Sequence, residues 1–328
     1  MSDVKEVLGN YSSDIIKSIE DDLSVITPNN LQEASIYLPK AGGKMLRPAL
    51  CLITAEAVGG KKEDALKAGS AIELIHTFSL IHDDIMDEAP LRRGLETVYH
   101  KWNSNIALLS GDTMLIKAFQ YALSTNKLYS QKILAELCNV ALEVCEGQQY
   151  DLNFETRDDV TLDEYIEMIR LKTAVLLGSV LKIGAIVAGA SEDNMKKVYD
   201  FGIDLGIAFQ LQDDLFDCYG DVKVFGKMPG GDIADNKKTY LYLKALELAS
   251  AEDKKLLEGY FSMPKGRDEK KQQAVLDIFE KYNVRVIVNG VMTGYYNNSL
   301  QHLEKITVSE EQKSVLRNYA DYLYNRIK

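Results

Sequence analysis

Residues 71–87 read AIELIHTFSLIHDDIMD, an apolar run that ends in the acidic motif DDIMD. The same order recurs at residues 201–217, FGIDLGIAFQLQDDLFD. Both apolar runs predict buried helices. Positions i and i+4 share one face of a helix, so the first and last aspartates of each motif stack on each other. Two buried helices that each end in stacked carboxylates therefore predict a helical fold and a cation-dependent site.

The two acidic motifs place charge where folding alone does not favour it. Carboxylates near a helix C-terminus oppose the helix dipole, and the pair Asp83 and Asp87 repel each other. Mg²⁺ removes the objection, because it prefers oxygen ligands and commonly binds one or two carboxylates together with substrate phosphates. For one motif alone, a solvated acidic helix end is the simpler interpretation. Two copies favour a magnesium site formed by Asp83, Asp84, Asp87, Asp213, Asp214 and Asp217.

Basic residues gather beside both motifs. The loops at residues 88–97 and 219–238 come directly after the motifs, and their Gly, Pro, Asp and Asn content predicts irregular backbone. A diphosphate needs several cationic contacts besides metal. The first loop and a helix that opens after Gly43 supply Arg92, Arg93, Lys44 and Arg47, and the second loop supplies Lys227, Lys237 and Lys238.

Helical periodicity dominates the rest of the chain, and alternating strand patterns are scarce. No composition shift marks a linker, so we expect one domain over residues 1–328. The expected helices are residues 4–23, 43–58, 62–87, 104–124, 127–154, 162–190, 192–218 and 309–327.

Composition excludes several classes of protein. The net charge of -11 argues against a sequence-independent nucleic-acid binder. The N-terminus has no signal-peptide pattern, and no uninterrupted apolar run is long enough for a membrane span. The four cysteines fall in apolar helical stretches without a CxxC pair, which indicates buried reduced thiols and a cytoplasmic location.

Several motifs in order resemble the trans-isoprenyl diphosphate synthases. They are GGKMLRP, DDIMDEAPLRRG, GQQYD, KTA, FQLQDDLFD and GKMPGGDIADNKKT, which extend from Gly42 to Thr239. The resemblance implies an all-α fold, a single-domain bundle of about a dozen mostly antiparallel helices around a deep central cavity, usually as a homodimer. It also implies a prenyltransferase that condenses isopentenyl diphosphate with dimethylallyl, geranyl or farnesyl diphosphate.

The resemblance also implies roles for single residues. Three Mg²⁺ ions would join Asp83, Asp87 and Asp213 to the allylic diphosphate, supported by the other three aspartates and with Asp151 nearby. The allylic diphosphate would be held by Arg92, Lys172, Lys227 and Lys237. Isopentenyl diphosphate would be held by Lys44, Arg47, His76 and Arg93. Thr173 and Gln210 would line the reacting carbons, and many relatives have glutamine where His76 stands.

Residues beside the first acidic motif indicate the length of the product, and the motifs themselves bear on two alternative functions. Phe78 stands five positions before Asp83 and Ser79 four, and an aromatic residue at the former position resembles geranylgeranyl diphosphate synthases of the archaeal type. A farnesyl product is the alternative. A terpene cyclase would need only one diphosphate site, and a non-catalytic partner subunit should have lost one motif; neither pattern is seen.

Overall fold

The computed structural model describes residues 2–41, 46–220 and 229–325. Helices account for nearly all of the regular structure in these ranges. The elements are α1 Ser2–Leu23, α2 Asn29–Lys40, α3 Leu46–Ala57, α4 Lys62–Met86, β1 Leu91–Arg92, β2 Leu95–Glu96, α5 Val98–Lys101, α6 Ser104–Leu123, α7 Ser130–Thr156, α8 Leu162–Ile169, η1 Arg170–Ala174, α9 Val175–Val187, α10 Glu192–Tyr219, α12 Gly231–Ala234, α13 Tyr240–Leu248, α14 Ala251–Phe261, α15 Glu269–Lys281, α16 Val284–Glu304 and α17 Glu310–Tyr324.

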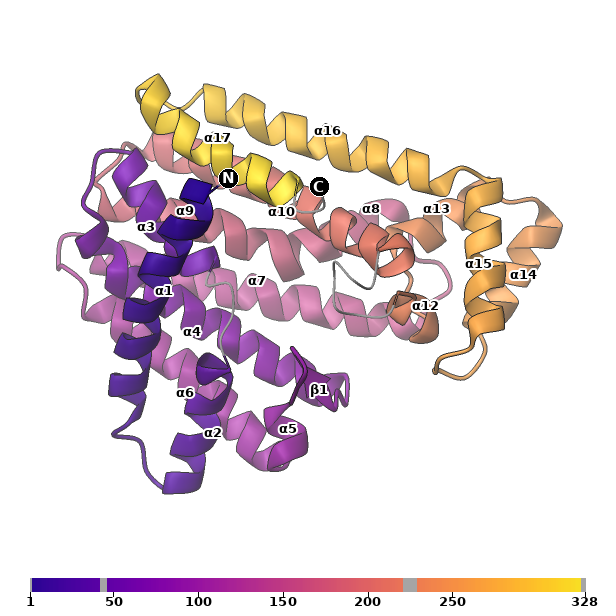
Figure 1. The fold of residues 1–328 in the computed structure, drawn as a ribbon, viewed down its shortest axis with the longest axis horizontal. Helices are drawn as coiled ribbons and strands as arrows, with labels where there is room; N and C mark the ends of the chain where they lie inside the picture. The colour runs from indigo at the N-terminus through magenta and orange to yellow at the C-terminus, as the bar shows by residue number, and fades with distance from the viewer. Residues whose placement is uncertain (1, 42–45, 221–228, 326–328) are drawn as a thin grey trace.

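The predicted all-α class is confirmed. In Figure 1, α7, α10 and α16 run along the long axis, and α14 and α15 close one end of the bundle. α10 packs against α9 and α16, while α4 packs against α3 and α6. α4 and α10 therefore lie within the bundle and hold their acidic ends in place.

Buried apolar residues form two clusters that α10 joins. The first gathers residues of α1, α3, α4, α6, α7, α9 and α17. The second gathers residues of α8, α13, α15 and α16 around the C-terminal half of α10. Ile203 and Tyr296 pack against both clusters, so the two cores are continuous.

The expected helices correspond to observed ones, with differences in detail. The loop at residues 219–238, expected to be irregular, contains the short helix α12. A helix at Asn29–Lys40 was not predicted, and it contains Pro39. The stretch at residues 162–190 is interrupted by the π turn η1. The loop at residues 88–97 was expected to be irregular but contains a hairpin, in which Arg93 and Gly94 both have positive φ (55° and 79°), as a tight two-residue turn requires.

The cysteine expectation is correct in part. All four thiols are free, and Cys51 and Cys218 are buried. Cys138 and Cys145 are exposed on α7, because they lie off the face of that helix that packs into the core. Within the described ranges, no helix combines the length and the apolar composition needed to cross a bilayer.

Candidate active site

A cavity of about 520 Å³ lies between α4, α7, η1 and α10. A second, more polar pocket of about 120 Å³ adjoins it, and the two share Leu152, Lys172, Thr173 and Gln210. Asp83 and Asp213 line the larger cavity, and Asp87 and Asp214 line the smaller one. Both acidic motifs therefore border the same pair of adjoining pockets.

The middle aspartate of the first motif is tied to the hairpin. Asp84 is only 2% exposed. The Nε of Arg92 donates to both of its carboxylate oxygens at 2.8 and 2.9 Å, and Arg92 Nη2 lies 3.4 Å from Asp83 Oδ2. Burial raises the pKa of Asp84, although the Arg92 guanidinium opposes that shift. The sequence predicted Arg92 as a diphosphate contact, and the structure adds this ion pair.

Asp83 carries an oxygen that is poorly satisfied by the protein. Its Oδ1 is buried and accepts no hydrogen bond from the described residues, although Lys172 Nζ lies 3.3 Å away. Lys172 instead donates to Asp151 Oδ2 at 2.6 Å. Buried polar atoms without hydrogen bonds are rare in proteins. This oxygen is therefore open to a further ligand.

The second motif is held by uncharged donors. Tyr165 Oη donates to Asp214 Oδ2 at 2.5 Å, and Gln210 Nε2 donates to Asp214 Oδ1 at 3.1 Å. Burial raises the pKa of Asp214 to about 7. The last aspartate, Asp217, accepts the backbone N–H of Asp232 through Oδ2 at 2.8 Å and so supports the start of α12.

The π turn η1 brings two predicted residues into the cavity. Lys172 and Thr173 both line it, and π turns within helices are frequent at functional sites. Neighbouring backbone passes very close on both sides: a Cβ on Gly147 of α7 would lie 2.4 Å from Lys172 N, and one on Gly206 of α10 would lie 2.6 Å from Ala174 Cα. Glycine is therefore required at both positions for the turn to seat.

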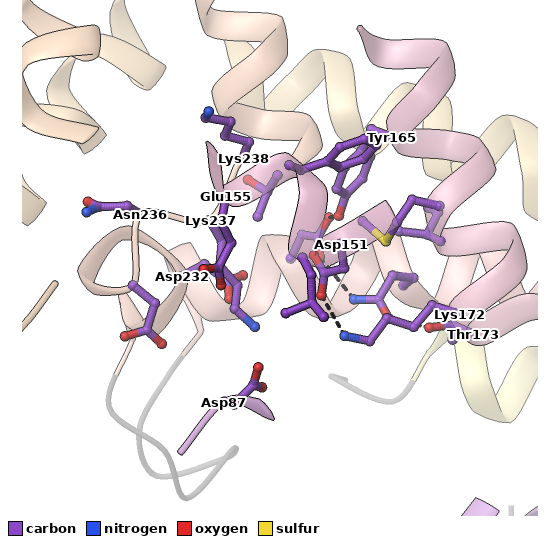
Figure 2. Close-up of a pocket in the computed structure, with 18 residues that line it drawn as sticks. Asp87, Asp151, Glu155, Tyr165, Lys172, Thr173, Asp232, Asn236, Lys237 and Lys238 are labelled. Carbon is purple, nitrogen blue, oxygen red and sulfur yellow. Dashed lines mark hydrogen bonds and ion pairs between the residues drawn. The ribbon is translucent and has the colours of Figure 1, made fainter. Parts of the chain in front are cut away.

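Lys237 and Lys238, adjacent in sequence, have different surroundings. Lys237 lies among carboxylates of Asp232, Asp151, Asp87 and Asp83; burial opposes protonation, but these carboxylates raise the pKa of Lys237. Lys238 Nζ instead donates to the carbonyl of Arg157 and to Asp158 Oδ1. Figure 2 shows the Lys237 side chain directed toward Asp87 and the Lys238 side chain directed the opposite way.

Three members of the second predicted cationic set, Arg47, His76 and Arg93, lie within the described residues. Arg47 Nη1 lies 3.0 Å from His76 Nε2. A guanidinium has no acceptor, so His76 Nε2 accepts in this contact. Burial and the charge of Arg47 hold the pKa of His76 well below its ordinary value, which keeps the imidazole neutral. Arg93 lies on the exposed hairpin turn.

Lys44 and Lys227 fall outside the described residues. Within them, no three carboxylate, imidazole or thiol groups are close enough to hold a metal ion on their own. This agrees with a Mg²⁺ site completed by phosphate and water oxygens, since Mg²⁺ commonly takes only one or two protein carboxylates. The open Oδ1 of Asp83 fits such an ion.

The two residues predicted to control product length lie on the cavity wall. Phe78 and Ser79 both line the larger cavity. The Phe78 ring packs edge-on against His82 with ring centroids 4.8 Å apart. Ser79 Oγ donates to His76 O at 2.9 Å.

Sequence reasoning missed two side chains of the smaller pocket. Tyr165 and Asp232 both line it. Asp232 lies within the quoted motif GKMPGGDIADNKKT, so that stretch contained a usable signal. Tyr165 carried none, because it lies in an ordinary amphipathic helix far from either acidic motif.

The chain is similar in sequence and in structure to prenyl diphosphate synthases. The family model for polyprenyl synthetase matches residues 28–279. A short chain isoprenyl diphosphate synthase of Methanothermobacter thermautotrophicus is 39% identical, covering 99% of each chain. A geranylgeranyl diphosphate synthase of Sulfolobus acidocaldarius is 36% identical over 97% of this chain and 98% of its own length. A crystal structure of a geranylgeranyl pyrophosphate synthase superposes with a TM-score of 0.92 at 40% identity, covering 98% of this chain and 99% of that one.

Proposed function

The chain belongs to the polyprenyl synthetase family and is a prenyltransferase, and on that premise we propose that it makes geranylgeranyl diphosphate. The substrates would be isopentenyl diphosphate and the allylic diphosphates dimethylallyl, geranyl and farnesyl diphosphate. The observation that carries this proposal is that both acidic motifs and three cationic side chains, Arg92, Lys172 and Lys237, border one cavity.

Magnesium fits the donor groups of this cavity. Asp83, Asp87 and Asp213 would hold three Mg²⁺ ions, with Asp84, Asp214 and Asp217 supporting them. When bound, the ions would neutralise the charge that develops on the departing diphosphate. Asp84 and Asp214 are already occupied by Arg92 and Tyr165, so their part is to orient the motif helices.

Ionisation of the allylic diphosphate is assisted by fixed positive charge. Lys172, Lys237 and Arg92, together with Lys227, would bind the diphosphate oxygens as the carbon–oxygen bond breaks. Asp151 holds Lys172 in place through the 2.6 Å contact. Preorganised cations of this kind stabilise a developing anion without reorganisation during the reaction.

The allylic cation needs electron-rich neighbours and no water. Thr173 Oγ1 donates to Gln210 Oε1 at 3.1 Å, and Gln210 donates in turn to Asp214, so the two oxygens facing the reacting carbons are oriented. Apolar side chains such as Leu176 and Phe209 line the same cavity and exclude water. The double bond of isopentenyl diphosphate attacks the cation, and the released diphosphate then accepts the proton.

Isopentenyl diphosphate would bind the second cationic set. Lys44, Arg47, His76 and Arg93 are the residues of that set. Arg47 Nε is buried and has no hydrogen-bond acceptor among the described residues, so it offers a donor to an incoming anion. Burial lowers the pKa of Arg47, which strengthens its need for an anionic partner.

One assay separates this function from its rivals. The protein is incubated with Mg²⁺ and each allylic diphosphate, with and without isopentenyl diphosphate, and products are identified by mass spectrometry. A prenyltransferase requires both substrates. Consumption of an allylic diphosphate alone would indicate a terpene cyclase, and no consumption would indicate a non-catalytic partner subunit.

Product length is proposed to end at twenty carbons because Phe78 narrows the cavity. Phe78→Ala should lengthen the products, while Ser79→Ala, which replaces one small side chain by another on the same wall, should leave them unchanged. Farnesyl diphosphate as the main wild-type product would favour the farnesyl synthase alternative. An unaltered product distribution in Phe78→Ala would exclude Phe78 as the floor.

The remaining proposals concern the whole molecule. We infer one domain over residues 1–328, a cytoplasmic location, and a homodimer. The homodimer is supported by apolar side chains exposed on the adjacent helices α6 and α7, namely Leu109, Ile116 and Leu142, which are 53%, 58% and 60% exposed. Exposed apolar patches mark association surfaces. Leu142→Glu should shift the sedimentation coefficient to that of a monomer.

A further inference from the structure

Lys237 comes directly after a helix end whose shape depends on Asn236. Asn236 has a left-handed φ of 57°. The N–H of Lys237 donates to Asp232 O at 2.9 Å, and the N–H of Asn236 donates to Ile233 O at 3.3 Å. This pattern is a Schellman motif, which requires a left-handed residue after the helix. Because Lys237 is the next residue, the conformation of Asn236 sets the direction in which Lys237 leaves the backbone.

The side chain of Asn236 is held at both ends. Its Nδ2 donates to Met263 O at 2.7 Å, and its Oδ1 accepts a hydrogen bond from Lys271 Nζ. Lys271 belongs to α15, far along the chain from both acidic motifs. Asn236 therefore connects the segment that carries Lys237 to α15, which lies at one end of the bundle.

Lys271 is costly to bury and has no ordinary ion pair. It is only 2% exposed, and burial lowers the pKa of its ammonium. Among the described residues, no carboxylate lies within ion-pair distance of its Nζ, and the Phe261 ring centroid is 5.7 Å away. A methionine of similar length would fill this space without desolvating a charge. The carboxylates of Asp268 and Asp235 partly offset the effect of burial, and the amide oxygen of Asn236 accepts a hydrogen bond from the ammonium.

α15 and the segment just before it also contact the residues around α12. Gln272, the next residue, donates from Nε2 to Pro229 O at 3.1 Å, and Gly266 N donates to Ala234 O at 2.9 Å. On the opposite side, Asp217 accepts the N–H of Asp232. α12 is thus held between the second acidic motif and the start of α15.

We propose that Lys271 and Asn236 are a pair of positioning residues that aim Lys237 at the diphosphate site. This inference rests on the proposed function of Lys237 as a diphosphate contact. Although Asn236 lines the smaller pocket, both ends of its amide are bonded to Met263 and Lys271 rather than turned toward a ligand. The pair acts through the backbone direction at residue 237, and its loss should weaken diphosphate binding while leaving isopentenyl diphosphate binding intact.

Two variants and a matched control test the pair. Lys271→Met keeps the length of the side chain but removes the donor, and Asn236→Gly keeps the left-handed backbone but removes the acceptor. The control is Lys313→Met on α17, which removes a lysine that is 8% exposed and donates to Glu304 O at 2.9 Å. It matches Lys271 in burial, and its ion-pair partners, Glu304 and Glu310, lie at the end of α16 and the start of α17 rather than in α12.

The first readout is affinity for inorganic pyrophosphate in the presence of Mg²⁺, measured by titration calorimetry. Lys271→Met and Asn236→Gly should each weaken it about tenfold, the scale of one well-placed charged contact, and Lys313→Met should not. In turnover assays, the KM for the allylic diphosphate should rise in both variants while the KM for isopentenyl diphosphate stays constant. In a Lys237→Met background, Lys271→Met should add nothing further.

A purely structural role for Lys271 predicts a different result. Lys271→Met would then lower the melting temperature as the control does, with pyrophosphate affinity unchanged or with losses that multiply those of Lys237→Met. Either outcome overturns the proposal.

Hydrogen exchange at Asn236 and Lys237 separates failure of this inference from failure of the proposed function. Faster exchange in Lys271→Met, compared with Lys313→Met, supports the positioning pair even if the wild-type protein proves inactive. Unchanged exchange in an active enzyme rejects the pair alone.

Discussion

The two acidic motifs have the same spacing, but the carboxylates of their middle aspartates receive hydrogen bonds from different kinds of donor. Asp84 receives a charged guanidinium from the hairpin at 2.8 and 2.9 Å. Asp214 receives only neutral donors, the Tyr165 hydroxyl and the Gln210 amide. In both motifs the middle carboxylate is buried and occupied, while the first borders the larger cavity. The two adjacent aspartates of each motif thus have different roles. The middle one anchors the helix end, and the first one faces the space where a ligand would bind.

The two motifs also differ in the backbone that comes directly after them. α4 ends at Met86, and the hairpin then returns Arg92 to the motif. α10 continues to Tyr219, so Asp217 remains helical and supports the start of α12. The first motif is therefore organised by a cation and the second by hydrogen bonds to backbone and neutral side chains.

The largest expected effect comes from the first aspartate of each motif. Asp83→Ala and Asp213→Ala should each lower turnover by about a thousandfold, because each removes a carboxylate from the charge-stabilising cluster. Turnover is measured with saturating Mg²⁺ and both substrates. Asp200→Ala, elsewhere on α10 and paired with Lys196, is the control and should be near wild type. Near-normal turnover in both motif variants would end the proposal, and a loss in only one would break their equivalence.

A smaller effect tests the charged anchor of the first motif. Arg92→Met leaves the Asp84 carboxylate buried without its cation, which should lower the free energy of unfolding by about 2 kcal/mol, less than for a fully buried pair because Arg92 is partly exposed. Urea unfolding measures the change. Adding Asp84→Asn should recover much of the loss, since the buried charge is then gone. Additive losses in the double variant would mean that the ion pair does not govern stability here.

The smallest effect tests the neutral anchor of the second motif and depends on pH. Tyr165→Phe should destabilise the metal-free protein by about 1.5 kcal/mol at pH 8, where Asp214 is ionised and the hydroxyl donates to a carboxylate. At pH 5 the loss should be smaller, because Asp214 is protonated in the folded state. Urea unfolding in chelator at the two pH values measures the difference.

The wild-type protein should show the matching pH dependence. The folded pKa of Asp214, about 7, exceeds its unfolded value near 4. The folded state therefore binds this proton more tightly, and the contribution of Asp214 to stability falls as pH rises from about 4 to about 7. Asp214→Asn should remove that slope. A slope that persists in the variant would assign it to another group.

Much of this fold was predictable because the helices are long and strongly periodic. The expected segment at residues 192–218 differs from α10 by one residue at its end. The terminal third was less predictable, since its helices are shorter and its charged residues carry no motif. α15 is an example of this lower predictability. Its sequence EKKQQAVLDIFEK is that of an ordinary surface helix, yet Lys271 is almost fully buried.

The candidate site was predictable where chemistry repeats along the chain, and not where it depends on three-dimensional approach. The paired aspartates were recognisable by their spacing. The roles of Lys237 and Lys238 could not be distinguished from the sequence, because the difference arises from the left-handed backbone at Asn236. Tyr165 reaches Asp214 only because α8 packs against α10, and no local pattern encodes that meeting.

The π turn at residues 170–174 has a consequence for the architecture as a whole. Such a turn inserts one extra residue into a helical path, which rotates everything beyond it by about 100°. Tyr165 and Met168 before it belong to the second core, whereas Val175 and Val180 after it belong to the first. A phase shift of one amino acid thus lets a continuous helical path contribute to two cores. Deleting a single residue there would put α9, which is buried at every position except Lys182, out of register with its neighbours.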